Sequence, residues 1–264
     1  MDTALAFIAA GLATAMAGAW IVQRLTGNSG WVDTIWSFAT GAGGVAAALV
    51  PAAGPRQIAV AVLIGLWSAR LGLHIAKRAA RGGDDPRYAA MARQWGRLWP
   101  LYLFVFLEIQ AAASLVLVLA VRLAAANPAP FPAATDLAGL VLLIVAVRGE
   151  AVADGQLRRF ARQHKGAVCD IGLWRWSRHP NYFFEWLGWC AWAVIAFDPL
   201  HPLSFAALGA PVLMYVLLVH VSGIPPLEAH MLASRGERFR AYQAATSAFF
   251  PAPPKAFTEQ GKPS

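Results

Sequence analysis

Residues 174–188 combine side chains that can bind an anion with others that can bind a polar ligand. The stretch reads Trp-Arg-Trp-Ser-Arg-His-Pro-Asn-Tyr-Phe-Phe-Glu-Trp-Leu-Gly, and Pro180 suits the first turn of a helix that enters an apolar segment. Asn181 and Glu185 are four residues apart and Tyr182 and Glu185 are three apart, so that all three share one helix face. A carboxylate at the start of a membrane helix is costly to place there, which makes Glu185 a candidate functional residue.

The loop directly before this helix is basic. Arg175, Arg178 and His179 lie beside the positive end of the helix dipole, an arrangement that favours an anion such as phosphate. A second interpretation is an interfacial anchor, because Trp, Arg and His gather at membrane boundaries in any case. An anchor needs neither Asn181 nor Glu185, so these two residues favour a binding site.

A second basic face precedes the loop. Asp154 and Arg158 are one helical turn apart, and Arg159 and Arg162 follow closely. Guanidinium groups bind phosphate through paired hydrogen bonds, so this face suits either a nucleotide with a 2′-phosphate or a lipid headgroup. The sequence contains neither Gly-x-Gly-x-x-Gly nor a Walker loop, and a dinucleotide would therefore be held without a Rossmann unit.

Metal chemistry is disfavoured by the spacing of the possible ligands. No two of the 6 histidines are three or four residues apart, so the paired His boxes of a membrane di-iron enzyme are missing. Cys169 and Cys190 are too few for a disulfide framework or a metal site. We therefore expect no metal, and we expect both cysteines to be packing residues.

These residues must be positioned by an integral membrane bundle. The chain of 264 residues is 58% hydrophobic and 14% charged, unlike an ordinary soluble protein. Because a spanning helix needs about 20 mainly apolar residues, the sequence predicts an all-α membrane protein with a single domain over residues 1–264 and seven transmembrane helices. We expect these helices at residues 4–23, 33–50, 57–76, 100–122, 135–157, 181–197 and 203–222.

Charge asymmetry predicts the orientation of this bundle. Most of the 22 Lys and Arg residues fall in the loops 24–32, 77–99 and 158–180 and in the tail after residue 223. The positive-inside rule then places the N-terminus outside and the C-terminus in the cytoplasm, as in a bacterial inner membrane. Anionic lipid accounts for the net charge of +8, so we expect membrane lipid as a partner and no nucleic acid. Residues 224–250 are expected to form a C-terminal interfacial helix.

Several ionisable residues fall within the expected spans, most of them near the cytoplasmic ends. Such residues usually face the bundle interior or a wet cavity, which predicts one cytoplasm-facing cavity. For Arg148, Glu150 and Glu108, internal ion pairing is the alternative. The ionisable residues are Asp33, Arg70, His74, Glu108, Arg148, Glu150, Asp154, Glu185 and His220.

The motif Trp-Ser-Arg-His-Pro-Asn-Tyr-x-x-Glu, preceded by Gly-Leu-Trp at 172–174, resembles the C-terminal signature of the steroid 5-alpha reductase family. It is most similar to the bacterial membrane branch of that family, long described only as a domain of unknown function. The resemblance covers nearly the whole chain. The flanking matches are Val32-Asp33 with Trp36, Trp-Ser-Ala-Arg-Leu at 67–71, Asp-Gly-Gln at 154–156 and Ser-Gly-Ile-Pro at 222–225.

The resemblance implies reduction of the 4,5 double bond of a 3-oxo-4-ene steroid, or of a similar flat apolar enone, by NADPH. Asn181 and Glu185 would hold the nicotinamide amide, whereas the face that begins at Asp154 and the tail would bind the ribose and phosphates. The implied cofactor-binding residues are Asp154, Arg158, Arg162, Trp174, Arg178, Asn181, Tyr182, Glu185, His230 and Arg235.

The substrate half departs from the family pattern. Where the steroid enzymes grip the 3-oxo group with a Glu and a Tyr, this sequence has Asp33 and Trp67, with Trp36 close by. A donor aimed at that oxygen stabilises the charge that builds there during hydride transfer. A protonated Asp33 or the Trp67 indole could donate this hydrogen bond, but Trp cannot release a proton as Tyr can. Tyr88, Tyr102 and water remain candidates for the final proton donor.

Two other functional classes compete with the reductase. The Arg-His-Pro-x-Tyr start and a Glu-containing tail helix also resemble membrane methyltransferases of the isoprenylcysteine carboxyl methyltransferase type, which use S-adenosylmethionine. Glu185, the face from Asp154 to Arg162 and Asp33 favour the reductase. A small transporter or lipid-binding scaffold is the third class, which the lack of a visible inverted repeat disfavours. A monomer is compatible with the sequence.

Overall fold

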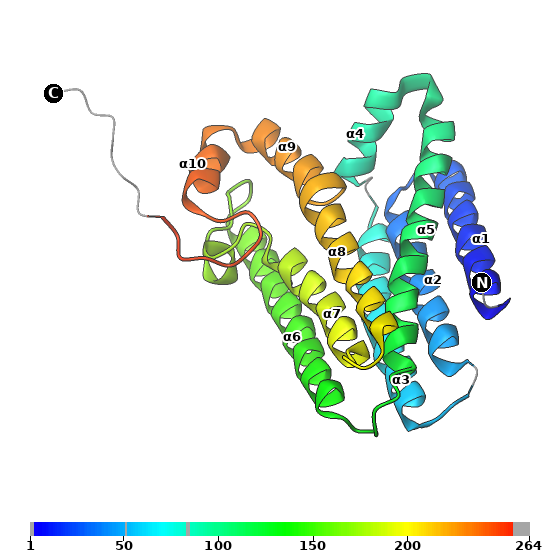
Figure 1. Cartoon of the computed structure of the whole chain (residues 1–264). Helices are drawn as coiled ribbons and strands as arrows, with labels where there is room; N and C mark the ends of the chain where they lie inside the picture. Colours follow the sequence, from blue (N-terminus) through cyan, green and yellow to red (C-terminus); the bar gives the residue numbers. More distant parts are fainter. Residues whose placement is uncertain (1–2, 51, 83–84, 256–264) are drawn as a thin grey trace. The chain divides into compact units, whose positions relative to one another are not determined.

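The computed structural model describes residues 3–50, 52–82 and 85–255, which form helices joined by loops, with no strand among them (Figure 1). Helical structure occupies each of the seven ranges expected to cross the membrane. The last of these ranges is composite, with a 3₁₀ segment Pro202–Leu208, helix α8 (Gly209–Val216) and a π-helical turn Leu217–Val221. The others are α1 (Thr3–Thr26), α2 (Gly30–Leu49), α3 (Pro55–Ala79), α5 (Trp99–Ala125), α6 (Ala134–Gln163) and α7 (Pro180–Ala196).

Within the part of the chain that the structure describes, four helical stretches are long and apolar enough to cross a membrane: Thr3–Thr26, Pro55–Ala79, Arg87–Ala125 and Pro202–Arg235. The remaining candidates are weaker for identifiable reasons. Helix α2 is rich in Gly and Ala, α6 carries several charged residues, and α7 has only 17 residues, at the short end of the range for a spanning helix. The chain is therefore a helical protein with membrane-like segments, and the number of seven crossings stays a prediction.

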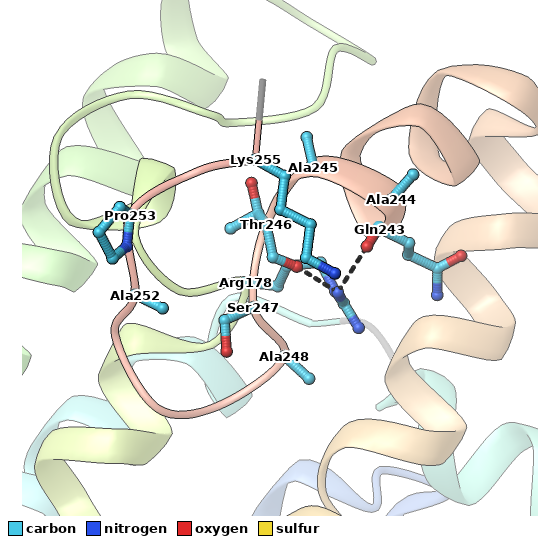
Figure 2. Close-up of a pocket in the computed structure, with 10 residues that line it drawn as sticks. All are labelled: Arg178, Gln243, Ala244, Ala245, Thr246, Ser247, Ala248, Ala252, Pro253 and Lys255. Atoms are coloured by element: carbon cyan, nitrogen blue, oxygen red, sulfur yellow. Dashed lines mark hydrogen bonds between the residues drawn. The ribbon is translucent and has the colours of Figure 1, made fainter. Parts of the chain in front are cut away.

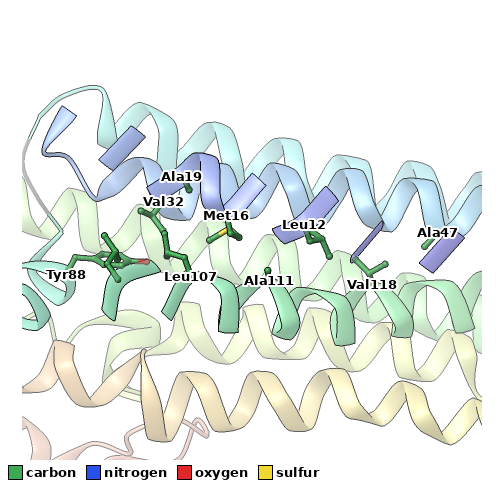
Figure 3. Packing of buried hydrophobic residues seen from close by; sticks show 10 residues of the cluster. Leu12, Met16, Ala19, Val32, Ala47, Tyr88, Leu107, Ala111 and Val118 are labelled. Atoms are coloured by element: carbon green, nitrogen blue, oxygen red, sulfur yellow. The ribbon is translucent and has the colours of Figure 1, made fainter. Parts of the chain in front are cut away.

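The chain forms two compact units. Unit 1 comprises Met1–Leu142 and Trp189–Met214, and unit 2 comprises Leu143–Gly188 and Tyr215–Ser264. In unit 1, α2 packs against α1, α3 and α5, and α1 also packs against α5. A buried cluster drawn from α1, α2, α4 (Pro86–Trp95) and α5 forms the core between them (Figure 3). Its members include Leu12, Met16, Val32, Tyr88, Leu107 and Val118.

The small residues of α2 allow α3 to approach it closely. A Cβ atom added at Gly41 would lie 2.1 Å from the Ser68 side chain, and one added at Gly44 would lie 2.8 Å from Ile64 Cγ1. Close backbone approach through small residues is a usual way for helices to pack in membranes. The same composition lowers the hydropathy of α2, which explains why a packed helix is a weak candidate span.

Helix α4 lies in a segment that we expected to be a cytoplasmic loop, residues 77–99. Its start is capped by Asp85, whose side chain accepts a hydrogen bond of 3.0 Å from the Arg87 backbone N–H. An Asp directly before a Pro is a common helix start, so the sequence did contain a signal for this helix.

The tail of unit 2 forms two helices where one helix over 224–250 was expected. Helix α9 (Ile224–Arg235) and helix α10 (Glu237–Ala245) are separated by Gly236, whose φ of +54° is in the left-handed region that favours glycine. The chain then runs back along the loop before α7, where the Ala252 N–H donates to the Trp176 carbonyl at 2.9 Å. The tail and this loop are thus parts of one packed region.

Candidate functional site

The predicted cofactor-binding residues all belong to unit 2. They come from three segments of it: the second half of α6, the loop and first turns around the start of α7, and α9. On α6 the residues are Asp154, Arg158 and Arg162; in the loop and α7 they are Trp174, Arg178, Asn181, Tyr182 and Glu185; on α9 they are His230 and Arg235. Residues far apart in sequence are thus contributed by a single compact unit.

Trp174 holds the loop against α6. Its indole N–H donates to the Ala153 carbonyl at 2.9 Å, and its own carbonyl accepts a hydrogen bond from the Tyr242 hydroxyl. One residue earlier, the Leu173 N–H donates to Gln156 Oε1 at 2.9 Å. Because Trp174 is buried and its donor is used within the protein, the structure gives it the task of orienting the loop next to Asp154.

Arg178 is held almost entirely by protein acceptors. Nε and Nη2 donate to the two carboxylate oxygens of Glu228 at 2.7 and 3.2 Å. Nη1 donates to the backbone carbonyls of Gln243, at 3.1 Å, and Thr246 (Figure 2). Four of the five N–H groups of this guanidinium are therefore used to bind α9 and the tail.

His179 is buried beside the same carboxylate. Its Nε2 lies 2.9 Å from Glu228 Oε1, and its ring stacks on that of Tyr182 with a centroid distance of 5.6 Å. Burial lowers the pKa of His179 and the Glu228 carboxylate opposes that shift, with a net lowering. A neutral imidazole that donates from Nε2 is consistent with both observations.

Glu228 was not among the predicted site residues, although it lies in the tail, residues 224–250, that was expected to be helical. Its carboxylate also accepts a 2.6 Å hydrogen bond from Gln243 Nε2. One feature of the sequence could have identified Glu228: it is an acidic residue in the second turn of a tail helix that is otherwise basic.

The other predicted cofactor residues differ in their access to solvent. Arg158, Arg162 and His230 are exposed, and Asp154, Asn181, Tyr182 and Glu185 are half-buried. Arg235 is half-buried, and its guanidinium donates to the Ala167 carbonyl at 3.4 Å and to Ser234 Oγ at 3.0 Å. The two α6 arginines are thus the ones that present their charge at the surface.

A pocket of about 360 Å³ lies in the tail region of unit 2 and includes Arg178 in its lining (Figure 2). The rest of the lining is residues 243–248, Ala252, Pro253 and Lys255. Most of the predicted cofactor residues are not part of this lining, so the cytoplasm-facing cofactor cavity stays a prediction.

In unit 1, Asp33 lies in the first turn of α2 and is an acceptor. The Tyr88 hydroxyl donates to Asp33 Oδ1 at 3.0 Å, and Arg87 Nη2 pairs with Asp33 Oδ2. Arg87 also pairs with Asp85, at 3.0 Å. Burial alone would raise the pKa of Asp85, but the hydrogen bonds and charge of Arg87 hold it below its ordinary value. Asp33 thus accepts hydrogen bonds from Tyr88 and Arg87, and a protonated Asp33 that donates one to the substrate stays a prediction.

Trp36 and Trp67, which were both predicted to bind the substrate, are neighbours. Their rings meet edge to face with centroids 6.4 Å apart, and Trp67 meets Trp189 in the same way at 5.1 Å. Trp67 and Trp189 are buried, so this contact packs unit 1. Trp189 directly follows the 174–188 motif, and its burial against Trp67 makes it a packing residue.

No group of three or more His, Cys, Asp or Glu is arranged for a metal ion within the part of the chain that the structure describes. Cys169 is buried and Cys190 half-buried, and both are free thiols. A metal-free site stays a prediction.

Comparison with known proteins gives one family. The family described as "Protein of unknown function (DUF1295)" matches residues 19–246. A protein of Schizosaccharomyces pombe that is described as uncharacterized is 26% identical over 268 residues, covering 88% of this chain and 75% of the relative. No solved structure matches the chain.

Proposed function

Because the chain belongs to the DUF1295 family, which is the steroid 5-alpha reductase-like family, we propose that it is an NADPH-dependent oxidoreductase. Its substrate would be a 3-oxo-4-ene steroid or a similar flat apolar enone, reduced at the 4,5 double bond. It would work in a bacterial inner membrane with its C-terminus in the cytoplasm, surrounded by lipid and with no nucleic-acid partner. The proposal rests on one observation: all of the predicted cofactor residues belong to unit 2.

The residues of unit 2 fit a dinucleotide with a 2′-phosphate. The exposed guanidinium groups of Arg158 and Arg162 would bind the phosphates, and Asp154 would accept from a ribose hydroxyl. Asn181 and Glu185 would hold the carboxamide, since an amide N–H₂ needs an acceptor and its carbonyl needs a donor. Bound NADPH would supply the hydride.

The substrate carbonyl would be received in unit 1. We propose that Tyr88 is the proton donor there: its hydroxyl, held 3.0 Å from the Asp33 carboxylate, would turn its single O–H from Asp33 to the substrate oxygen when substrate binds. In this arrangement Asp33 orients the phenol, and Arg87 adds positive charge where the enolate oxygen develops its negative charge. Trp36 would offer flat apolar surface to the substrate rings, and the buried Trp67 would back it through their edge-to-face contact. Asp33 and Trp67 keep their proposed place beside the carbonyl, and Tyr88 supplies the proton that Trp67 cannot.

The deciding experiment is a titration of detergent-purified protein with NADPH, NADH and S-adenosylmethionine, followed by thermal unfolding. A ligand that binds only the native state stabilises it by about 2.7 kcal/mol at a hundredfold excess over its Kd. We expect stabilisation by NADPH, a smaller effect of NADH, and NADPH oxidation when a 3-oxo-4-ene steroid is added. Stabilisation by S-adenosylmethionine alone would refute the reductase and support the methyltransferase.

A further inference from the structure

Glu228 connects two of the segments that carry predicted cofactor residues. It lies on α9, two residues before His230 and seven before Arg235, and it binds the two residues directly before α7. We propose that Glu228 is a positioning residue of the cofactor site, which fixes α9 and the tail to the start of α7. This inference rests on the proposed function.

The carboxylate of Glu228, on α9, accepts four hydrogen bonds from two other segments of unit 2. Oε1 accepts from Arg178 Nε at 2.7 Å and from His179 Nε2 at 2.9 Å. Oε2 accepts from Arg178 Nη2 at 3.2 Å and from Gln243 Nε2 at 2.6 Å. The loop before α7, helix α9 and helix α10 are therefore joined at one group.

The charged side chains of this cluster are largely shielded from water, so solvent weakens the interactions between them only a little. The side chains of Arg178 and Glu228 are 11% and 12% exposed, and that of His179 is 5% exposed. Removing one partner of a buried pair leaves the other charge without compensation, a large penalty, whereas exposed pairs contribute little. The chain offers a matched exposed pair nearby, Arg240 with Glu237, at 67% and 82% exposure.

The cluster acts on the site through particular neighbours. Glu228 holds the His179 ring, and that ring stacks on Tyr182, one of the predicted cofactor residues, at 5.6 Å. Arg178 gives four of its five N–H groups to Glu228 and to tail carbonyls, so its main effect on a cofactor is to set the positions of α9 and α7. Asn181 lies three residues after Arg178, in the first turn of α7.

The test compares Glu228→Gln with Glu237→Gln in the full-length protein in detergent. Glu228→Gln keeps the shape but removes the charge, and we expect the Kd and KM for NADPH to rise about tenfold while kcat changes by less than about threefold. Glu237→Gln should leave both constants unchanged. The double variant Arg178→Ala/Glu228→Gln should lose no more affinity than the worse single variant, because the two residues act as one unit. Unchanged NADPH affinity in Glu228→Gln, or additive losses, would overturn the inference.

A milder variant and a second readout cover the case in which Glu228→Gln does not fold. Gln243→Leu removes one hydrogen bond to Glu228, and we expect about a threefold rise in the Kd for NADPH. Without cofactor, backbone amides of residues 237–250 should exchange faster with solvent in both variants. If the wild-type protein does not bind NADPH, the proposed function fails, whatever the exchange shows. If NADPH binds and exchange in 237–250 is unchanged, the positioning role of Glu228 fails instead.

Discussion

Replacement of Arg56 by methionine should lower the free energy of unfolding by about 3–5 kcal/mol, the usual cost of removing one partner of a buried ion pair. Arg56 lies at the start of α3, and its side chain is 6% exposed; that of its partner Asp136 is 9% exposed. The pairing is bidentate, with Nε 2.9 Å from Oδ1 and Nη2 2.7 Å from Oδ2. Both residues belong to unit 1, so the prediction does not depend on the proposed function.

The magnitude follows from what the substitution leaves behind. Asp136 would keep the 2.7 Å hydrogen bond from the Ala133 N–H but lose the guanidinium that compensates its charge. Arg56 also donates to the carbonyls of Asn127, Ala129 and Pro130, the last two at 2.7 and 3.3 Å. Replacing Asp136 by leucine as well removes the stranded charge and leaves these carbonyls and the Ala133 N–H to be satisfied. The double variant should therefore cost about 1–3 kcal/mol, less than Arg56→Met alone.

The assay is reversible unfolding in mixed detergent for the wild type, Arg56→Met, Asp136→Leu and the double variant. The exposed pair of Arg240 with Glu237 gives the control, since Arg240→Gln should change stability by no more than about 0.5 kcal/mol. A loss of less than about 1 kcal/mol for Arg56→Met, or single losses that add in the double variant, would refute the reasoning.

Three further predictions concern the proposed site. Tyr88→Phe should lower kcat for a 3-oxo-4-ene steroid by about 10²–10³ without changing the Kd for NADPH, because it removes a donor to the developing oxyanion; turnover at the wild-type rate would exclude Tyr88. Glu185→Ala should weaken NADPH binding at least about tenfold by removing an acceptor for the carboxamide, and an unchanged Kd would remove Glu185 from the site. Burial holds the pKa of His179 below its ordinary value, so the unfolded state binds more protons as pH falls through about 6.5, and stability is lost toward acid. The melting temperature should therefore fall between about pH 7.5 and about pH 5.5, more steeply than in His179→Gln; equal slopes would show that other groups cause the loss.

The helical ranges were predictable because they depend on local composition. The apolar run expected at 100–122 lies within α5, Trp99–Ala125, and the one at 57–76 lies within α3, Pro55–Ala79. Helix α4 was missed because it is short and its buried side chains, such as the ring of Tyr88, pack against a core drawn from other helices. The break at Gly236 was missed because a single glycine in a helical pattern is often tolerated.

The candidate site was predictable only where its residues are neighbours in sequence. Asn181, Tyr182 and Glu185 share a helix face, and their spacing alone shows this. The pairing of Arg178 with Glu228 joins residues 50 positions apart, and that of Arg87 with Asp33 joins residues 54 apart. The periodicity of a sequence does not reveal such contacts. It shows which residues share a face of one helix, but not which residues of distant segments pack together.

The same limit means that sequence spacing does not identify the acceptor of an arginine in a basic motif. A guanidinium presents the same planar set of donors to a phosphate, a carboxylate or a backbone carbonyl, and spacing does not distinguish among them. Burial does, because a charge taken out of water must be matched by fixed partners in the protein, as Arg178 is by Glu228 and the tail carbonyls. An exposed arginine such as Arg158 or Arg162 has no such requirement and keeps its charge available to a ligand. The positive charge for a cofactor phosphate is therefore to be sought on α6, while the motif before α7 supplies the frame that holds the polar residues of α7 and α9 in place.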